Sequence, residues 1–146
     1  LRKIAELYPS YKIVVTGGND YFHQVKSPRS NHCFGQGIDF VILGYNEEQL
    51  DNVVDILDKF CVMNQGPNTV FGYIDEYRNP SSMASGKHFH IAIGNNTKPL
   101  SGSSSKGAKK AIQKLGTKFV SMKKPNVPLS KEELQSLYPG YKLNFI

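Results

Sequence analysis

The chain has little cysteine, and the two cysteines are not spaced for a structural staple. Only Cys33 and Cys61 occur among its 146 residues, too few for a disulfide scaffold and without the paired spacing of a cysteine zinc site. We expect both to be reduced thiols that pack like small apolar residues. Stability therefore has to come from an ordinary hydrophobic core. Hydrophobic residues make up 39% of the chain, which is enough for the core of one domain of this length.

Long apolar runs are also missing. No stretch of about 18 apolar residues occurs, so no membrane span is expected, and no signal-peptide pattern opens the chain. The sequence begins at Leu1 rather than at a methionine, which suggests a processed product or one domain of a larger parent protein.

Arginine is absent from the last third, where the positive charge gathers. Residues 1–95 carry 8 Lys or Arg against 10 acidic residues, whereas residues 96–146 carry 10 Lys against 2 Glu, so the two parts have net charges of −2 and +8. We predict a core at 1–95, a Ser/Gly-rich linker or loop at 96–107 and a basic C-terminal extension at 108–146. Such an extension suits an anionic polymer, either a wall polymer or nucleic acid, although a solvated lysine-rich surface explains it equally well.

The apolar patterning predicts an α+β fold with a small antiparallel sheet flanked by helices. Helices are expected at 1–8, 47–61, 108–115 and 129–137, and strands at 11–16, 37–44, 69–74 and 88–93. The nearly continuous apolar run at 37–44 predicts a central strand. Residues 21–31 and 75–87 are polar and contain proline, which indicates irregular loops.

The histidines carry the main chemical signal. His32 lies seven residues before Asp39, which begins a strand, so a loop ligand and a strand ligand can converge. His88 and His90 are two apart on a strand and point to the same face of the sheet. Two histidines and an aspartate bind zinc with one position left open, as catalytic sites require, and zinc then activates water and polarises a carbonyl.

Two motifs resemble a known family. The segment SNHCFGQGIDF, residues 30–40, is similar to the Ser-x-His-x-x-Gly-x-Ala-x-Asp motif of zinc D-alanyl-D-alanine carboxypeptidases and phage L-alanyl-D-glutamate endolysins. KHFHI, residues 87–91, resembles the closing His-x-His of the same family. The likeness covers residues 11–94 and implies the fold that these peptidases share with the Hedgehog signalling domain.

The resemblance implies roles for particular residues. His32, Asp39 and His90 would bind Zn²⁺, and His88 would stabilise the reacting centre. Many members carry an acidic general base three residues before the last ligand, where this chain has Lys87. In the Hedgehog-type arrangement the acid lies further upstream, which makes Glu76 the candidate base; His88 acting without an acid is the alternative.

Substrate contacts are less well marked. Where members that bind a free peptide terminus carry a Ser-Gly-Tyr-Arg-like element, this chain has TGGND, which contains no arginine. Arg29, Ser30, His23 and Gln24 are therefore the candidate substrate-binding residues, although plain loop positions would look the same. The missing arginine favours an endopeptidase over a carboxypeptidase.

These expectations add up to a zinc metallopeptidase that hydrolyses peptidoglycan stem peptides or cross-links. It would act in the bacterial cell wall or periplasm and come from a phage virion or a phage-infected host. The alternatives are a non-catalytic zinc-stabilised binding module of the same fold, which would bind zinc without cutting, and a nucleic-acid-binding protein, which would leave the histidines unexplained.

Overall fold

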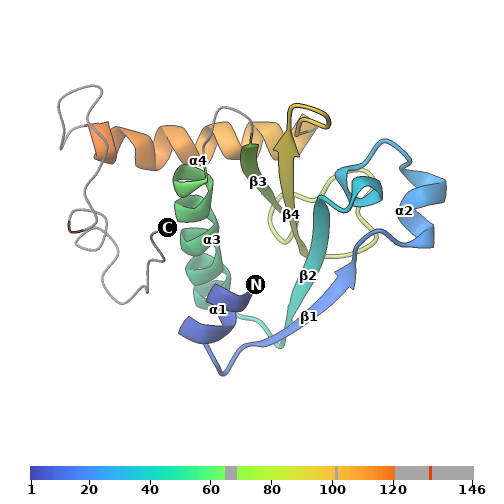
Figure 1. Ribbon diagram of the computed structural model, residues 1–146. Coiled ribbons are helices and arrows are strands. Elements are labelled where there is room, and N and C mark those ends of the chain that lie inside the picture. Colours follow the sequence, from blue (N-terminus) through green and yellow to red (C-terminus); the bar gives the residue numbers. More distant parts are fainter. Residues whose placement is uncertain (65–68, 101, 121–131, 133–146) are drawn as a thin grey trace.

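The computed structural model describes residues 1–64, 69–100, 102–120 and 132, and these form one four-stranded antiparallel sheet with helices (Figure 1). The elements in chain order are α1 (Arg2–Leu7), β1 (Lys12–Gly17), α2 (Tyr21–Lys26), the 3₁₀ helix η1 (Asn31–Phe34), β2 (Gly37–Leu43), α3 (Glu47–Met63), β3 (Thr69–Asp75), β4 (Phe89–Asn95) and α4 (Gly102–Val120). The prediction of an α+β fold with a small antiparallel sheet is confirmed.

The strands are ordered β1-β2-β4-β3, and every neighbouring pair is antiparallel. The helix α3 connects β2 to β3, and β4 then returns between them. The strand β2 is therefore paired on both sides, as its continuous apolar run predicted. This order places β2 beside β4, the two strands that carry the candidate metal ligands.

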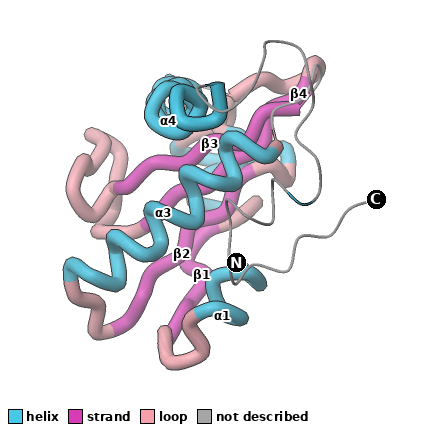
Figure 2. The backbone as a smooth tube through the Cα atoms, turned by 90° about the vertical axis from the view of Figure 1, so that its left-hand side faces the viewer, coloured by secondary structure: helices cyan, strands magenta, loops and turns pink. Residues whose placement is uncertain are grey.

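One face of the sheet is the apolar core. The helix α3 lies across this face (Figure 2), and its buried side chains Leu50, Val53 and Ile56 pack with Phe40 of β2 and Phe89 of β4. Side chains alternate along a strand. The neighbours of Phe40 and Phe89, including Asp39 and His90, therefore point to the opposite face.

The start of α3 follows from local sequence. The Asn46 side chain accepts a hydrogen bond from the Gln49 N–H at 2.9 Å, and the Gln49 side chain accepts one from the Asn46 N–H at 3.2 Å. The N–H groups at the start of a helix have no carbonyl acceptor in a preceding turn, and this capping box supplies acceptors for two of them. Glu47 and Glu48 then lie at the positive end of the helix dipole, where acidic side chains are favourable.

The helix α4 differs from the prediction at its start. Residues 102–107, expected to belong to a linker, are helical and continue the helix expected at 108–115. Ala108 and Ala111 are buried, and a Cβ atom added to Gly107 would collide with the carbonyl oxygen of Tyr73. Tertiary packing against the outer strand β3 therefore supports a helix that its Ser/Gly-rich beginning does not favour.

A buried carboxylate joins α3, β3 and α4. Asp58 accepts hydrogen bonds from the Tyr73 hydroxyl at 2.6 Å and from the Lys114 ammonium at 2.7 Å. Burial, reinforced by the negative charge of Asp58, raises the pKa of Tyr73 well above its ordinary value. The polar link fixes the register of α4 against the rest of the fold.

The remaining sequence predictions concern the C-terminal region, the cysteines and membrane spans. The helix expected at 129–137 lies almost entirely outside the described residues, and a separate basic extension stays a prediction. Neither cysteine forms a disulfide. No helix within the described part of the chain is long and apolar enough to cross a membrane.

Candidate metal centre

The first candidate ligand, His32, is positioned by η1. The Ser30 side chain caps this short helix by accepting from the His32 N–H at 3.3 Å, and Gly35 ends it in the left-handed conformation with a φ of 67°. Gly37 lets η1 approach β2, because a Cβ atom there would lie 2.9 Å from the His32 backbone nitrogen. His32 is buried as a result, with 2% of its surface exposed.

Asp39 and His90 are brought together by strand register. They are directly paired residues of β2 and β4, and paired side chains on the same face of a sheet are near neighbours. The His90 Nδ1 atom lies 2.9 Å from Asp39 Oδ1. Their proximity depends on the pairing of two strands that are far apart in sequence.

His32 completes a compact group of three ligand atoms. Its Nε2 atom lies 3.0 Å from His90 Nδ1 and 3.2 Å from Asp39 Oδ1. Tetrahedral zinc bonds of about 2.0–2.2 Å place neighbouring ligand atoms about 3.3–3.6 Å apart. A zinc ion therefore fits among these three atoms after each moves outward by a few tenths of an ångström, roughly the difference between these separations.

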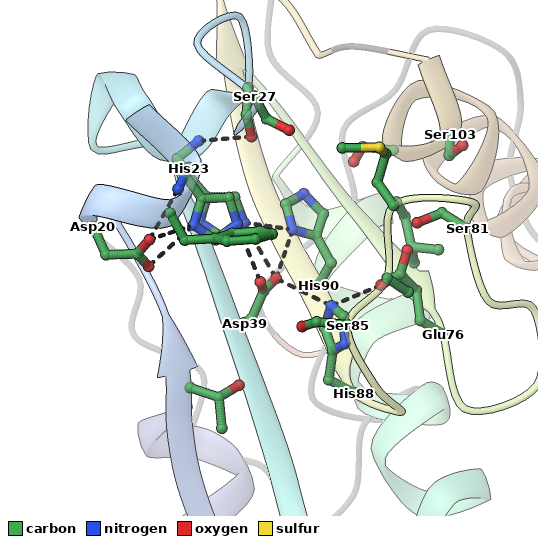
Figure 3. Close-up of a pocket in the computed structure, with 18 of the residues that line it drawn as sticks. Asp20, His23, Ser27, Asp39, Glu76, Ser81, Ser85, His88, His90 and Ser103 are labelled. Carbon is green, nitrogen blue, oxygen red and sulfur yellow. Dashed lines mark hydrogen bonds and ion pairs between the residues drawn. The ribbon is translucent and has the colours of Figure 1, made fainter. Parts of the chain in front are cut away.

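The charge of Asp39 suits a cation site. Burial by itself raises the pKa of this carboxyl group, but hydrogen bonds and positive charge from His32 and His90 outweigh burial and hold it well below its ordinary value. Asp39 is thus an anion at neutral pH, as a metal ligand must be. Its oxygens are the point on which the surrounding imidazoles converge (Figure 3).

His23 is the fourth histidine at this point. Its Nε2 atom lies 3.6 Å from Asp39 Oδ2, and its ring stacks on that of His32 with centroids 3.8 Å apart. Ligand atoms of His23, His32 and Asp39 lie within 4.8 Å of one another, a second combination able to hold a metal ion. The two combinations share His32 and Asp39, and the distances are shorter in the one that includes His90.

His88 and Glu76 form a pair beside the ligands. His88 Nε2 lies 3.5 Å from Asp39 Oδ1 and 2.7 Å from Glu76 Oε2, while His88 Nδ1 lies 2.8 Å from the Gly86 carbonyl oxygen. A carbonyl only accepts, so Nδ1 must carry a proton. Nε2 is thus the ring atom that faces the Glu76 carboxylate, and a proton between these two atoms would give a hydrogen bond.

Neighbouring residues hold Glu76 in place. Glu76 is buried with 4% exposed, and its N–H donates to the His88 carbonyl oxygen at 3.0 Å, which extends the β3–β4 ladder. The next residue, Tyr77, is buried in the core and its hydroxyl accepts from the Ile42 N–H. Arg78 then pairs with Glu47 at 2.9 Å and with Asp51 at 2.7 Å on α3.

These groups line one open cleft of about 790 Å³ on the face of the sheet opposite α3 (Figure 3). Its walls include Arg29 and Ser30, two of the predicted substrate contacts, together with Ser27, Ser81, Ser85, Ser103 and Ser104. His23, a third candidate, also lines the cleft, whereas Gln24, the fourth, is exposed, and its amide donates to Asn19 at 3.1 Å. Lys87, at the position where the resembled family carries an acid, is exposed as well.

The structure thus brings His32, Asp39, His88, His90 and Glu76 together and adds a feature that the sequence reasoning missed. Residues 21–26, predicted to be irregular, form α2, and Asp20 caps it while orienting His23. An aspartate three residues before a histidine, after the turn-forming segment Gly17-Gly18-Asn19, was the available signal for this capped turn. No protein-family model, curated protein or solved structure matches this chain.

Proposed function

We propose that this chain is a zinc peptidase domain with the Hedgehog-like architecture of D-alanyl-D-alanine peptidases and that it hydrolyses peptide bonds of peptidoglycan. The observation that carries the proposal is the convergence on Asp39 of His32, His88 and His90, with Glu76 behind them, in one open cleft. The order and spacing of His32, Asp39, His88 and His90 are those of the two motifs, whereas Glu76 lies outside both.

His32, Asp39 and His90 are the residues that would hold the ion. A zinc ion bound there supplies an activated water and polarises the carbonyl of the scissile bond. The anionic state of Asp39 and the 2.9–3.2 Å separations of the three ligand atoms support this assignment.

In this proposal Glu76 transfers the proton and His88 stabilises the developing negative charge. Glu76 is the general base, because its carboxylate is fixed at the floor of the cleft with a neighbour that can share its proton. His88 directs Nε2 toward both Glu76 and Asp39, so a small turn of its ring lets it donate to the developing oxyanion. The acid at position 76 takes the role that Lys87 cannot.

The cleft supports a polar peptide substrate. It is open along the sheet and rich in serine hydroxyls, and Arg29 provides one cation for a substrate carboxylate. The peptides of peptidoglycan carry such carboxylates. Action in the bacterial wall or periplasm, a phage-associated source and attachment to an anionic wall polymer through the lysines of residues 96–146 are parts of the same proposal.

The second candidate is a non-catalytic zinc-stabilised module of the same fold. The proximity of His23 to the ligand group favours it, because a fourth histidine can close a metal site that catalysis needs open. Such a module binds zinc and releases no fragments.

The deciding experiment treats intact peptidoglycan of several chemotypes with zinc-loaded protein and identifies released fragments by mass spectrometry. His90→Ala is the variant that removes a ligand, and Val25→Ala, an exposed position on α2, is the matched control. Stem-peptide fragments from the wild type and Val25→Ala but not from His90→Ala establish the enzyme and identify its bond. Zinc binding without fragments from any wall refutes the peptidase and leaves the binding module.

A further inference from the structure

The surroundings of His23 resemble those of a metal-binding histidine. Its Nδ1 atom lies 2.9 and 3.0 Å from the two oxygens of Asp20. An anionic carboxylate only accepts, so Nδ1 carries a proton, and in the neutral imidazole the lone pair is then on Nε2. Metal-ligating histidines commonly have this carboxylate partner, which fixes the tautomer and makes the ligand nitrogen more basic.

Asp20 is itself held in place. Its oxygens accept from the backbone N–H groups of Gly18 at 2.9 Å and of His23 at 3.0 Å. These hydrogen bonds, followed by the contact with the His23 ring, lower the pKa of Asp20 to about 2. The carboxylate is therefore charged and oriented by backbone hydrogen bonds, and the His23 ring has Nε2 toward Asp39 (Figure 3).

The chain also makes room for His23 at this point. A Cβ atom on Gly17 would lie 2.7 Å from Asp39 Oδ2 and 3.1 Å from His23 Cε1. Any larger residue at the end of β1 would enter the space between the two side chains. The close approach of His23 to the ligand group thus depends on a glycine and on a capped helix, two separate features of the backbone.

We propose that His23 is a fourth protein ligand of the metal, so that in the resting protein the ion is held by His23, His32, Asp39 and His90. The inference rests on the metal site of the proposed function and adds a ligand that neither motif contains. It replaces the role of substrate contact expected for His23 from the sequence.

A fourth ligand changes how the site works. Four protein ligands fill a tetrahedral zinc site, so hydrolysis requires His23 to leave or the ion to accept a fifth ligand. Departure is feasible because α2 is six residues long and contains no buried residue. His23 would then be an exchangeable ligand.

The test uses ¹¹³Cd²⁺ as the metal probe on the complete chain and records scalar couplings between cadmium and histidine ring protons by NMR. Only a histidine bonded to the ion shows this coupling. The inference expects couplings to His23, His32 and His90. Couplings to His32 and His90 without His23 overturn it and leave the proposed function intact, whereas absence of metal binding overturns both.

A second measurement needs no cadmium. Zinc affinity is determined by competition with a chelator for the wild type, His23→Ala, Asp20→Asn and the control Val25→Ala. We expect affinity to fall by about tenfold or more in the first two variants and to stay within about twofold in the control, which changes an exposed side chain. His23→Ala with the affinity of the wild type contradicts the assignment. Asp20→Asn keeps His23 and its size, so it tests the orientation without removing the ligand.

Discussion

Replacement of Asp39 by asparagine is the most informative single change, because Asp39 is the one charged ligand of the candidate centre. Asparagine keeps the shape of the side chain and removes the anion that His32 and His90 surround at 2.9–3.2 Å. We expect the metal-free fold to persist, since the core lies on the other face of the sheet. The stabilisation by zinc should be lost.

The magnitude follows from mass action. Zinc at a free concentration of 100 times its Kd stabilises the wild type by about 2.7 kcal/mol, which in a chain of this size raises Tm by roughly 10 °C. Changes to residues that only support a ligand raise Kd by up to about 100-fold, and we take this value for the loss of the ligand Asp39 itself. At the same zinc concentration, the stabilisation by zinc then falls to about 0.4 kcal/mol. The shift in Tm then falls to roughly 1–2 °C.

The assay is thermal unfolding followed by circular dichroism, with zinc at fixed free concentration and with chelator. Asp55→Asn, which removes an exposed carboxylate on α3 paired with Lys59, is the matched control and should keep the full shift. An Asp39→Asn protein that is stabilised by zinc as strongly as the wild type would refute the ligand assignment. A wild type that shows no shift would refute the metal site itself.

Four other predictions can be checked separately. Glu76→Gln should keep zinc affinity within about twofold but reduce the rate of peptide release by about 10²–10⁴; cleavage at the wild-type rate would exclude Glu76 as the base. Asp58→Ala should lower the free energy of unfolding by about 1–3 kcal/mol, because the partly buried Tyr73 hydroxyl loses its acceptor, and urea denaturation measures this loss. Burial and the nearby Asp58 raise the pKa of Cys61 to about 12, so at pH 8 a thiol reagent should label the half-buried Cys33 and leave Cys61 unlabelled until the protein unfolds. Binding to anionic wall polymer, if carried by the lysines of residues 96–146, should weaken steeply between low and high salt in a sedimentation assay; affinity that does not change with salt would rule the electrostatic attachment out.

Elements with strong local patterns could be predicted from the sequence. Strand β2 and helix α3 were expected at 37–44 and 47–61 and occur at Gly37–Leu43 and Glu47–Met63, because a continuous apolar run and helical periodicity are local properties of the sequence. The shared direction of His88 and His90 also follows from two-residue spacing on one strand.

Other elements depended on contacts between distant parts of the chain. The first turn of α4 forms in a Ser/Gly-rich segment because Gly72 and Gly94 leave space for Leu100 and Ser104 against the sheet. The six residues of α2 are too few for periodicity to show, and they become helical through their cap at Asp20.

The candidate site divides in the same way. Residue types and spacing along the sequence, together with the resemblance of two motifs to a zinc peptidase family, selected His32, Asp39, His88 and His90 as candidates, because metal ligands require particular side chains. Only the tertiary structure decided that Asp39 and His90 are paired across β2 and β4, that Glu76 meets His88, and that His23 joins the group. Such distances are set by strand register and by the close packing of backbones at glycines, which are properties of the whole fold rather than of any one segment.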